Sequence, residues 1–173
     1  MKELWKEFKL FKDDFLYWFL KIKIIWDRKK KLIWLSQSSY IDKIANLAVS
    51  KQSDAILMSK NELLSYTDVA LFSQINLYQQ KINFLMYAAV ITHSDIVFAV
   101  SWLVCFLINL ESLHLVITNQ TLLYLKRYRD LNLQLNEDNR YTMINDISFV
   151  DNIADQKSSQ SYIIKLFRNF VKW

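Results

Sequence analysis

The sequence predicts an α+β protein in which a β-hairpin comes first, helices follow, and further strands end the chain. Three observations predict this order. Aromatic and β-branched residues flank a polar turn early in the chain, apolar residues recur at helical spacing through the middle, and short alternating segments follow Lys126. The 173 residues suffice for one domain or for parts of two small ones.

The first third of the chain is expected to hold a helix, a hairpin and a second helix. Residues 2–12 have the pattern of a short charged helix with one apolar face. The hairpin is expected from about Phe15 to Leu35, because two apolar runs flank the polar turn at 27–30. Ser36 is a suitable N-cap for a helix that runs to about Ala48.

The rest of the chain is expected to be helical and then extended. A polar connecting segment at 50–73 precedes three helices, at about Leu77–Ile91, Asp95–Asn109 and Glu111–Lys126. The polar breaks between these helices are short, which favours antiparallel packing. Strands are expected at 131–135, 141–150 and 161–167, where apolar and polar residues alternate.

The composition is unusual because the chain contains no glycine and no proline. Average usage is about 7% glycine and about 5% proline. Glycine supplies positive φ angles in tight turns, and proline stiffens turns and ends helices. Their joint absence indicates that something other than folding shaped the composition.

Few residues suggest chemistry. The single cysteine, Cys105, excludes an internal disulfide and a multi-cysteine metal site, and we expect it to be a small buried apolar residue. His93 and His114 lack neighbouring ligand patterns, so no metal site is expected there. Asp146 lies in a strand pattern. It would need a partner or a metal ion if it pointed inward, and it is unremarkable if it points outward at a strand end.

Charge and hydropathy leave the partner open. The net charge of +5 and the pI near 9.2 permit a nucleic-acid or anionic-surface partner. The N-terminal residues alternate charges with aromatics, so we expect no secretory signal and an intracellular protein. The most apolar segment, Ile96–Leu110, is shorter than the roughly 20 residues of a membrane span. A buried or partner-facing helix is therefore preferred over a membrane-associated protein built on residues 84–110.

Several motifs resemble a copia-type retrotransposon polyprotein. THSDIVFAV resembles the family's Thr-Arg-Pro-Asp-Ile-x-Phe-Ala-Val, and FLKIKI resembles its Phe-Leu-Gly-Ile-x-Ile. NDISFVD resembles Ser-Asp-Ala-Ser-Phe-Ala-Asp at the start of the family's ribonuclease H domain, and QKSSQSY resembles its Arg-Lys-Ser-x-x-Gly-Tyr. Most of the chain is similar to the family, in the family's order.

The resemblance implies a domain organisation. Residues 1–135 would be the C-terminal part of a reverse transcriptase, with a hairpin that serves as primer grip and helices of the thumb and connection. Residues 136–173 would be the truncated start of a ribonuclease H-like domain, so its sheet would be incomplete. In the intact family, RNA-directed DNA synthesis uses paired aspartates in a Tyr-x-Asp-Asp motif, which this chain lacks.

The resemblance also implies site residues. The thumb would lie along an RNA/DNA duplex, with phosphates contacted by Lys43, Lys81, Lys126, Arg127 and Arg129. A charged, solvated face is the alternative for each of them. Asp146 matches the first of the ribonuclease H carboxylates that bind Mg²⁺ in the intact family. One carboxylate cannot hold two metal ions, so neither catalysis nor a cofactor is expected for this chain.

The chain departs from the family pattern in a consistent direction. Family glycines correspond to Lys21, Asn83 and Ser161, family prolines to Ser94 and Leu110, and family arginines to His93, Trp102 and Gln156. C-to-T or G-to-A transitions make many of these changes, which suggests a decayed copy of a transposable element, a pseudogene fragment. Lost turn glycines at two of these positions, Asn83 and Ser161, would cost about 1 kcal/mol each wherever φ must be positive.

Three functions remain in view. The first is a degenerate reverse transcriptase fragment without catalytic activity, and the second is a module with residual non-specific affinity for nucleic acid. The third is the less favoured membrane-associated protein. Trp102, Cys105 and Ile108 would give one helix an apolar outer face, so self-association or aggregation is expected as well.

Overall fold

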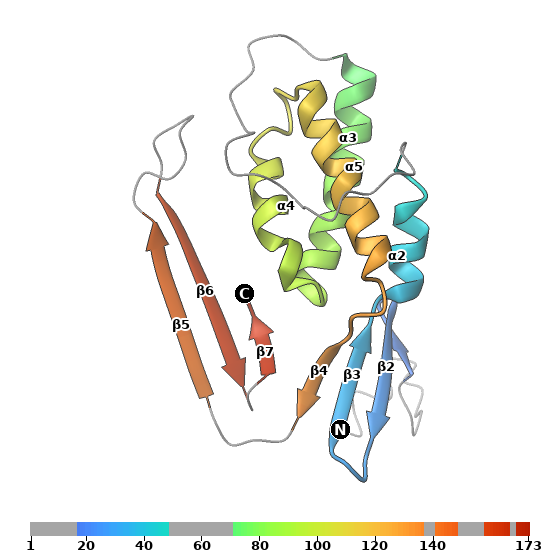
Figure 1. Ribbon diagram of the computed structural model, residues 1–173, viewed down its shortest axis with the longest axis vertical. Helices are drawn as coiled ribbons and strands as arrows, with labels where there is room; N and C mark the ends of the chain where they lie inside the picture. The colour runs from blue at the N-terminus through green and yellow to red at the C-terminus, as the bar shows by residue number, and fades with distance from the viewer. Residues whose placement is uncertain (1–16, 49–70, 137–140, 149–157, 167–168) are drawn as a thin grey trace, which may run out of the picture.

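The computed structural model describes residues 17–48, 71–136, 141–148, 158–166 and 169–173. The helices there are α2 (Ser38–Ala45), α3 (Phe72–Ile91), α4 (Val97–Val104) and α5 (Ser112–Arg127), with a 3₁₀ turn, η1 (Ser94–Ile96), before α4. The strands are β1 (Trp18–Phe19), β2 (Ile22–Asp27), β3 (Leu32–Ser36), β4 (Leu133–Asn136), β5 (Tyr141–Ser148), β6 (Ser159–Leu166) and β7 (Asn169–Lys172). Helices and antiparallel sheets are segregated, so the fold is α+β, as predicted (Figure 1).

The first sheet is built on the predicted hairpin. Its antiparallel strand order is β1-β2-β3-β4, and Ile25 of β2 lies opposite Trp34 of β3. The predicted strand at 131–135 is confirmed as β4, which returns from far along the chain and pairs Leu133 with Leu35. The hairpin tip points away from the helices (Figure 1).

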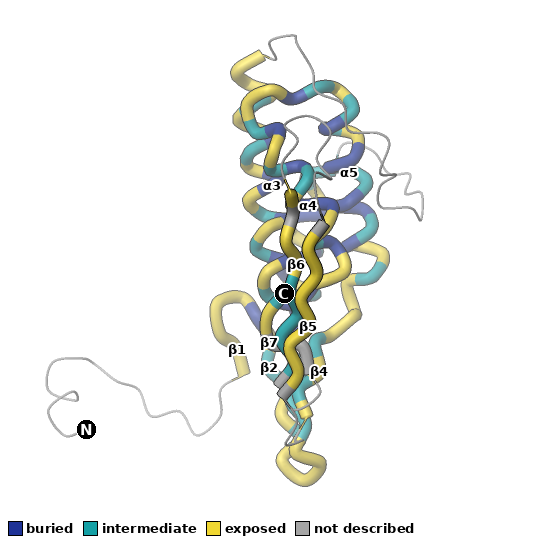
Figure 2. The backbone as a smooth tube through the Cα atoms, turned by 90° about the vertical axis from the view of Figure 1, so that its left-hand side faces the viewer, coloured by how far each residue is buried: buried dark blue, intermediate teal, exposed yellow. Residues whose placement is uncertain are grey.

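The core lies among the four helices, where buried residues concentrate (Figure 2). Apolar side chains from all four helices form one cluster, and the Tyr78 hydroxyl crosses it to donate to the Leu103 carbonyl oxygen at 2.7 Å. The fully buried apolar residues at its centre are Ile41, Tyr78, Leu85, Ala88, Ile96, Leu103, Leu122 and Leu125. This cluster holds the helices together and leaves the hairpin strands more exposed.

The helices occur where the sequence predicts them, but their ends differ. α3 begins at Phe72, inside the segment expected to be a connection, and α4 ends at Val104 instead of near Asn109. After α4 the chain turns so that Phe106 and Leu110 enter the core. The turn leaves Cys105 exposed, which corrects the expectation that this cysteine is buried.

Two helix N-termini show how the sequence begins a helix. Gln37 stands at the N-cap of α2, one residue after the predicted Ser36, whose Oγ instead lies 3.2 Å from Ser38 Oγ. α5 begins with a capping box, in which Glu111 caps the helix and donates its own backbone N–H to His114 Nδ1 at 2.8 Å. The box fixes the start of α5 where the sequence predicts it.

The second sheet has the order β5-β6-β7 and is antiparallel. The predicted strands at 141–150 and 161–167 are confirmed as β5 and β6, whereas β7 was not predicted. β7 lies beside β4 of the first sheet. The C-terminal Trp173 donates from Nε1 to the Ala89 carbonyl oxygen at 2.7 Å, which ties this end of the chain to α3.

Positive φ angles occur at Leu20 (47°), Lys21 (66°) and Lys31 (54°) among the described residues. Lys21 is one position where the copia-like pattern has glycine. Asn83 lies inside α3 and Ser161 inside β6, and neither has a positive φ, so the expected cost of a lost glycine at these two positions is wrong.

Some predictions lie outside the described residues. These are the helix at residues 2–12 and most of the connection at 50–73. Within the described part, no helix combines the length and the apolar character needed to cross a bilayer.

Candidate nucleic-acid interface

Residues 17–31 hold a charge excess that equals the net charge of the whole chain. This segment carries six basic residues and one acidic residue, Asp27, and the chain as a whole has a net charge of +5. All six basic residues are exposed. They are Lys21, Lys23, Arg28, Lys29, Lys30 and Lys31. The remaining residues are therefore neutral in sum, and the hairpin is the basic end of the molecule.

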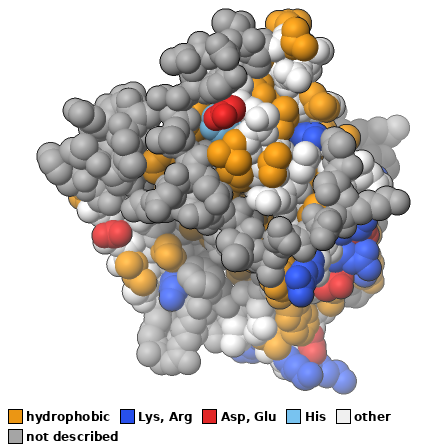
Figure 3. Space-filling model, turned by 45° about the horizontal axis from the view of Figure 1, so that its top comes forward, with side chains coloured by type: hydrophobic (Ala, Val, Ile, Leu, Met, Phe, Trp, Pro, Cys, Tyr) orange, Lys and Arg blue, Asp and Glu red, His pale blue; other side chains and the backbone are white. Residues whose placement is uncertain are grey.

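The acidic residue of the hairpin is used by the turn itself. Asp27 Oδ1 accepts the backbone N–H groups of Lys29 and Lys30, each at 3.0 Å. Its Oδ2 lies 3.9 Å from Lys30 Nζ. These contacts fold the tip, and the single carboxylate leaves the segment with an excess of five positive charges. In Figure 3 basic side chains gather toward the lower right of the view.

Aromatic side chains stand among these charges. Tyr17 is 63% exposed and Trp26 is 57% exposed. The guanidinium carbon of Arg28 lies 4.5 Å from the Trp26 ring centroid, a cation–π distance. A groove of about 580 Å³ opens here, and its walls include Tyr17, Ile25, Trp26, Arg28, Lys29 and Trp34. Aromatic rings interleaved with basic side chains are typical of surfaces that bind nucleic acid strands.

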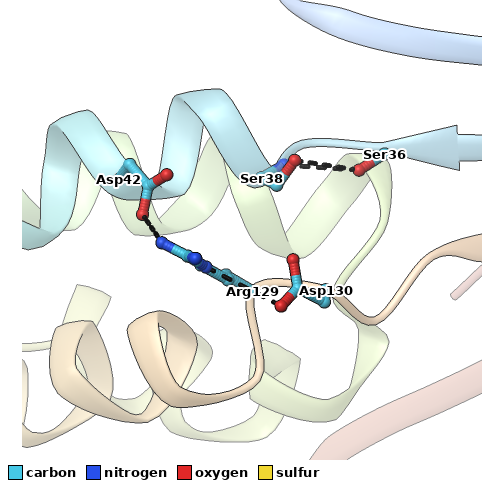
Figure 4. Close-up of polar contacts among 5 residues, drawn as sticks. All are labelled: Ser36, Ser38, Asp42, Arg129 and Asp130. Atoms are coloured by element: carbon cyan, nitrogen blue, oxygen red, sulfur yellow. Dashed lines mark hydrogen bonds and ion pairs between the residues drawn. The ribbon is translucent and has the colours of Figure 1, made fainter.

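The predicted phosphate contacts on the helices have mixed positions. Lys43 is exposed on α2, and Lys126 and Arg127 are exposed in the last turn of α5. Arg129 is exposed just beyond α5, but its Nη1 lies 2.7 Å from Asp42 Oδ1 (Figure 4). This group lies where α2 packs along α5, away from the hairpin tip (Figure 1).

Lys81 is not available to a phosphate. It is 1% exposed in α3, and its Nζ donates to Asn119 Oδ1 at 2.7 Å. Burial lowers the pKa of this ammonium group. Its assignment as a phosphate contact is therefore corrected: Lys81 is a core residue that joins α3 to α5.

Asp146 is exposed in the middle of β5, opposite Ser161 of β6. Asp146 is therefore not buried, and it does not lie at a strand end. Among the described residues, no three His, Cys, Asp or Glu side chains lie close enough to hold a metal ion together. The described surroundings of Asp146 thus do not fit a two-metal site.

The two histidines belong to the core. His93 Nδ1 lies 3.3 Å from Asp95 Oδ1, and His114 stacks on Phe106 with ring centroids 4.2 Å apart. Burial alone would raise the pKa of Asp95, but hydrogen bonds with His93 and Tyr124 outweigh it and hold this pKa below its usual value. Burial lowers the pKa of His114. These groups stabilise helix ends and do not line the groove.

The pattern at 27–30 predicts a turn, and by itself it does not mark the basic residues of the hairpin tip as a binding surface. The available signal was the local charge count together with the neighbouring tryptophans and tyrosine. Comparison with known proteins adds no assignment: no family model, no curated protein and no solved structure matches this chain.

Proposed function

We propose that this protein is a non-catalytic nucleic-acid-binding module that descends from a copia-like reverse transcriptase. The β1–β3 hairpin is its contact surface. One observation carries the proposal: the whole net positive charge of the chain is concentrated in an exposed hairpin that also presents aromatic rings. No catalytic step is proposed, since the described surroundings of Asp146 do not fit a metal site.

The origin is supported by the motifs and by one backbone angle. Lys21 has a φ of 66° at the place of glycine in the family's Phe-Leu-Gly-Ile-x-Ile. Glycine adopts this angle without strain, whereas a lysine there is strained by its Cβ. A turn of this shape is one that glycine fits best, which agrees with a glycine having been lost during decay.

Binding through the hairpin would be electrostatic and independent of sequence. Lysine and arginine side chains neutralise phosphates and release counterions, so the logarithm of affinity falls with the logarithm of salt by about 0.9 per contact. Phosphate contacts position a protein without reading bases. The Arg28–Lys31 turn alone offers four basic side chains, which predicts a slope of roughly −3 to −4.

The test is fluorescence anisotropy with a labelled oligonucleotide at about 50 and 200 mM salt. The tip variant Arg28→Gln/Lys29→Gln/Lys30→Gln removes three positive charges. The matched control, Lys43→Gln/Lys126→Gln/Arg127→Gln, removes three from the α2–α5 side. We expect the tip variant to lose at least about ten-fold in affinity at low salt, with a slope shallower by about 3.

We expect the control to lose less than about three-fold. A larger loss in the control than in the tip variant would move the interface to the helices. Absence of any binding by the wild-type protein at low salt would remove the proposed function.

A further inference from the structure

We infer that the groove beside β2 takes an unpaired base, so that the hairpin binds single-stranded nucleic acid in preference to duplex. The inference rests on the proposed function and names its substrate class. The observations that carry it are a groove along β2, aromatic residues in its lining, and basic groups beside them.

The groove opens beside β2, beyond the last described residue that pairs with it. Ile24 donates its backbone N–H to the carbonyl oxygen of Tyr17, which precedes β1, at 2.8 Å. From Ile25 to Asp27 the edge of β2 is left uncovered by the described part of the chain. The groove of about 580 Å³ opens along this stretch. That volume falls within the range of about 300–1,000 Å³ found for small-molecule sites.

The lining of the groove includes aromatic residues that are more than half exposed. Tyr17 and Trp26 expose more than half of their surface, and Ile25 exposes 41% of its own. Trp34 of β3, which lies opposite Ile25, also belongs to the lining. A concave site lined by aromatic side chains with a few charged groups is a candidate ligand site. A base offers a flat π face to such rings whatever its identity.

The charges select a nucleic acid over a neutral ligand. The Arg28 guanidinium carbon lies 4.5 Å from the Trp26 ring centroid, so a base stacked nearby would bring its phosphate within reach of Arg28 and Lys29. Asp27 also lines the groove, where its Oδ1 accepts the backbone N–H groups of Lys29 and Lys30, so one carboxylate stands among the basic groups. The groove is thus basic and aromatic at the same time.

Duplex and single-stranded nucleic acid differ in how accessible their bases are to this groove. In a duplex the bases are stacked on one another, and the protein meets mainly phosphates. In a single strand the bases are free to leave their neighbours and stack on aromatic side chains. One stacked base is expected to strengthen binding about ten-fold, and only the single strand gains it.

The test compares a labelled oligothymidylate with a duplex of equal length, in low salt, on three proteins. Wild type should bind the single strand about ten-fold more tightly. Trp26→Leu should lose that advantage and keep its duplex affinity within about two-fold. The matched control is Trp18→Leu, which is 52% exposed on β1 and outside the groove lining, and it should leave both affinities within about two-fold.

The possible outcomes distinguish the preference for single strands from the proposed nucleic-acid binding itself. Equal wild-type affinity for the two oligonucleotides would overturn the inference and leave the proposed function in place. Absence of binding to either would remove both. Stronger capture of an acidic, aromatic-free peptide than of the oligothymidylate would also overturn it. The wild-type comparison of single strand with duplex needs no variant. It therefore still tests the preference for single strands if Trp26→Leu fails to fold.

Discussion

Arg129 Nη1 lies 2.7 Å from Asp42 Oδ1, and this ion pair joins the chain beyond α5 to α2 across 87 positions of sequence (Figure 4). The guanidinium group also lies 3.7 Å from Asp130 Oδ2. Asp42 raises the pKa of Arg129 further, so the arginine stays charged, but two carboxylates offset that charge. A residue selected from the sequence as a phosphate contact is therefore engaged within the protein.

The Asp42–Arg129 pair predicts two substitutions with little effect on binding. Arg129→Gln should leave oligonucleotide affinity within about three-fold, because the pair lies on the α2–α5 side, away from the hairpin tip. Asp42→Asn frees the positive charge of Arg129 but, for the same reason, should change the salt slope by much less than the roughly 0.9 of one phosphate contact. Anisotropy titrations at several salt concentrations measure both. A loss of affinity in Arg129→Gln as large as in the tip variant would contradict this.

The two-residue turn between β1 and β2 predicts a stabilising substitution. Leu20 and Lys21 both have positive φ, the geometry of a type I′ turn, which prefers Asn-Gly. Leu20→Asn/Lys21→Gly should raise the free energy of unfolding by about 1 kcal/mol, because leucine and lysine are both destabilised by the left-handed backbone conformation that they adopt in the native turn. The loss of the contact between Lys21 Nζ and the Tyr40 ring, at 5.7 Å, offsets part of the gain.

Chemical denaturation measures this effect, with Lys23→Gly as control. Lys23 lies in β2 without a positive φ, so glycine there should destabilise the protein by about 0.5–1 kcal/mol. The Tyr87 hydroxyl donates to the Leu20 carbonyl oxygen, a backbone group that the turn substitution retains. An unfolding midpoint that falls in both variants would show that the turn does not favour glycine.

Local patterns were sufficient to predict most elements but not their long-range partners. The pairing of β2 with β3 follows from residues adjacent in sequence and was predicted correctly, but the expected single first strand was wrong, because a turn at Leu20 and Lys21 divides it into β1 and β2. The pairing of β4 with β3 depends on residues about 100 positions apart, such as Leu133 and Leu35. Alternation alone predicts a strand and says nothing of its neighbour.

The site residues were harder to predict because charge alone does not fix burial. Lys81 lies on α3 between apolar neighbours, and only the fold reveals that Asn119 of α5 meets its ammonium group. The direction of Asp146 stayed open because the described residues of β5 are exposed on both faces, so alternation does not distinguish a buried side.

Lys81 also predicts a gain in stability when its charge is removed. Its burial lowers the pKa of the ammonium group, so the charged form destabilises the fold at neutral pH. Lys81→Met keeps an unbranched chain and should raise the free energy of unfolding by about 1 kcal/mol near pH 7. The control Lys43→Met, on the exposed side of α2, should change it by less than about 0.5 kcal/mol. Equal changes in the free energy of unfolding of the two variants would contradict a destabilising buried charge at Lys81.

His114 predicts a loss of stability in mild acid. Burial lowers its pKa below the ordinary 6.5, while the nearby Glu111 acts weakly in the opposite direction. Below pH 6.5 the unfolded chain therefore binds a proton at His114 more readily than the folded protein does. The contribution of His114 to the free energy of unfolding is fully present above pH 6.5 and declines as the pH falls below it. Protonation of Nδ1 would also remove the acceptor for the Glu111 N–H.

The variant His114→Gln separates titration from capping. Glutamine supplies an acceptor at the same position of the capping box and has no proton to take up. Unfolding free energies measured between about pH 5 and pH 7 should fall less steeply in this variant than in the wild type. Parallel pH profiles would show that another group controls acid stability.

The free edge of β5 predicts self-association. On one side β5 pairs with β6, and no described strand pairs with its other edge. Met143, Ile144 and Ile147 are 56%, 47% and 66% exposed, and Asp146 is the one charged residue between Tyr141 and Ser148. A long apolar edge without lysine or proline is a template for pairing with another chain. We therefore expect the average mass in light scattering to rise with protein concentration.

Ile147→Lys should suppress that rise, because a charged side chain on an edge strand opposes pairing. The matched control is Ile108→Lys, which replaces an isoleucine of similar exposure, 72%, in the segment between α4 and α5. If the control restores a constant mass and Ile147→Lys does not, association runs through the α4 side, as the apolar residues Trp102 and Ile108 would favour. A constant mass in the wild-type protein would exclude both routes over the concentrations measured.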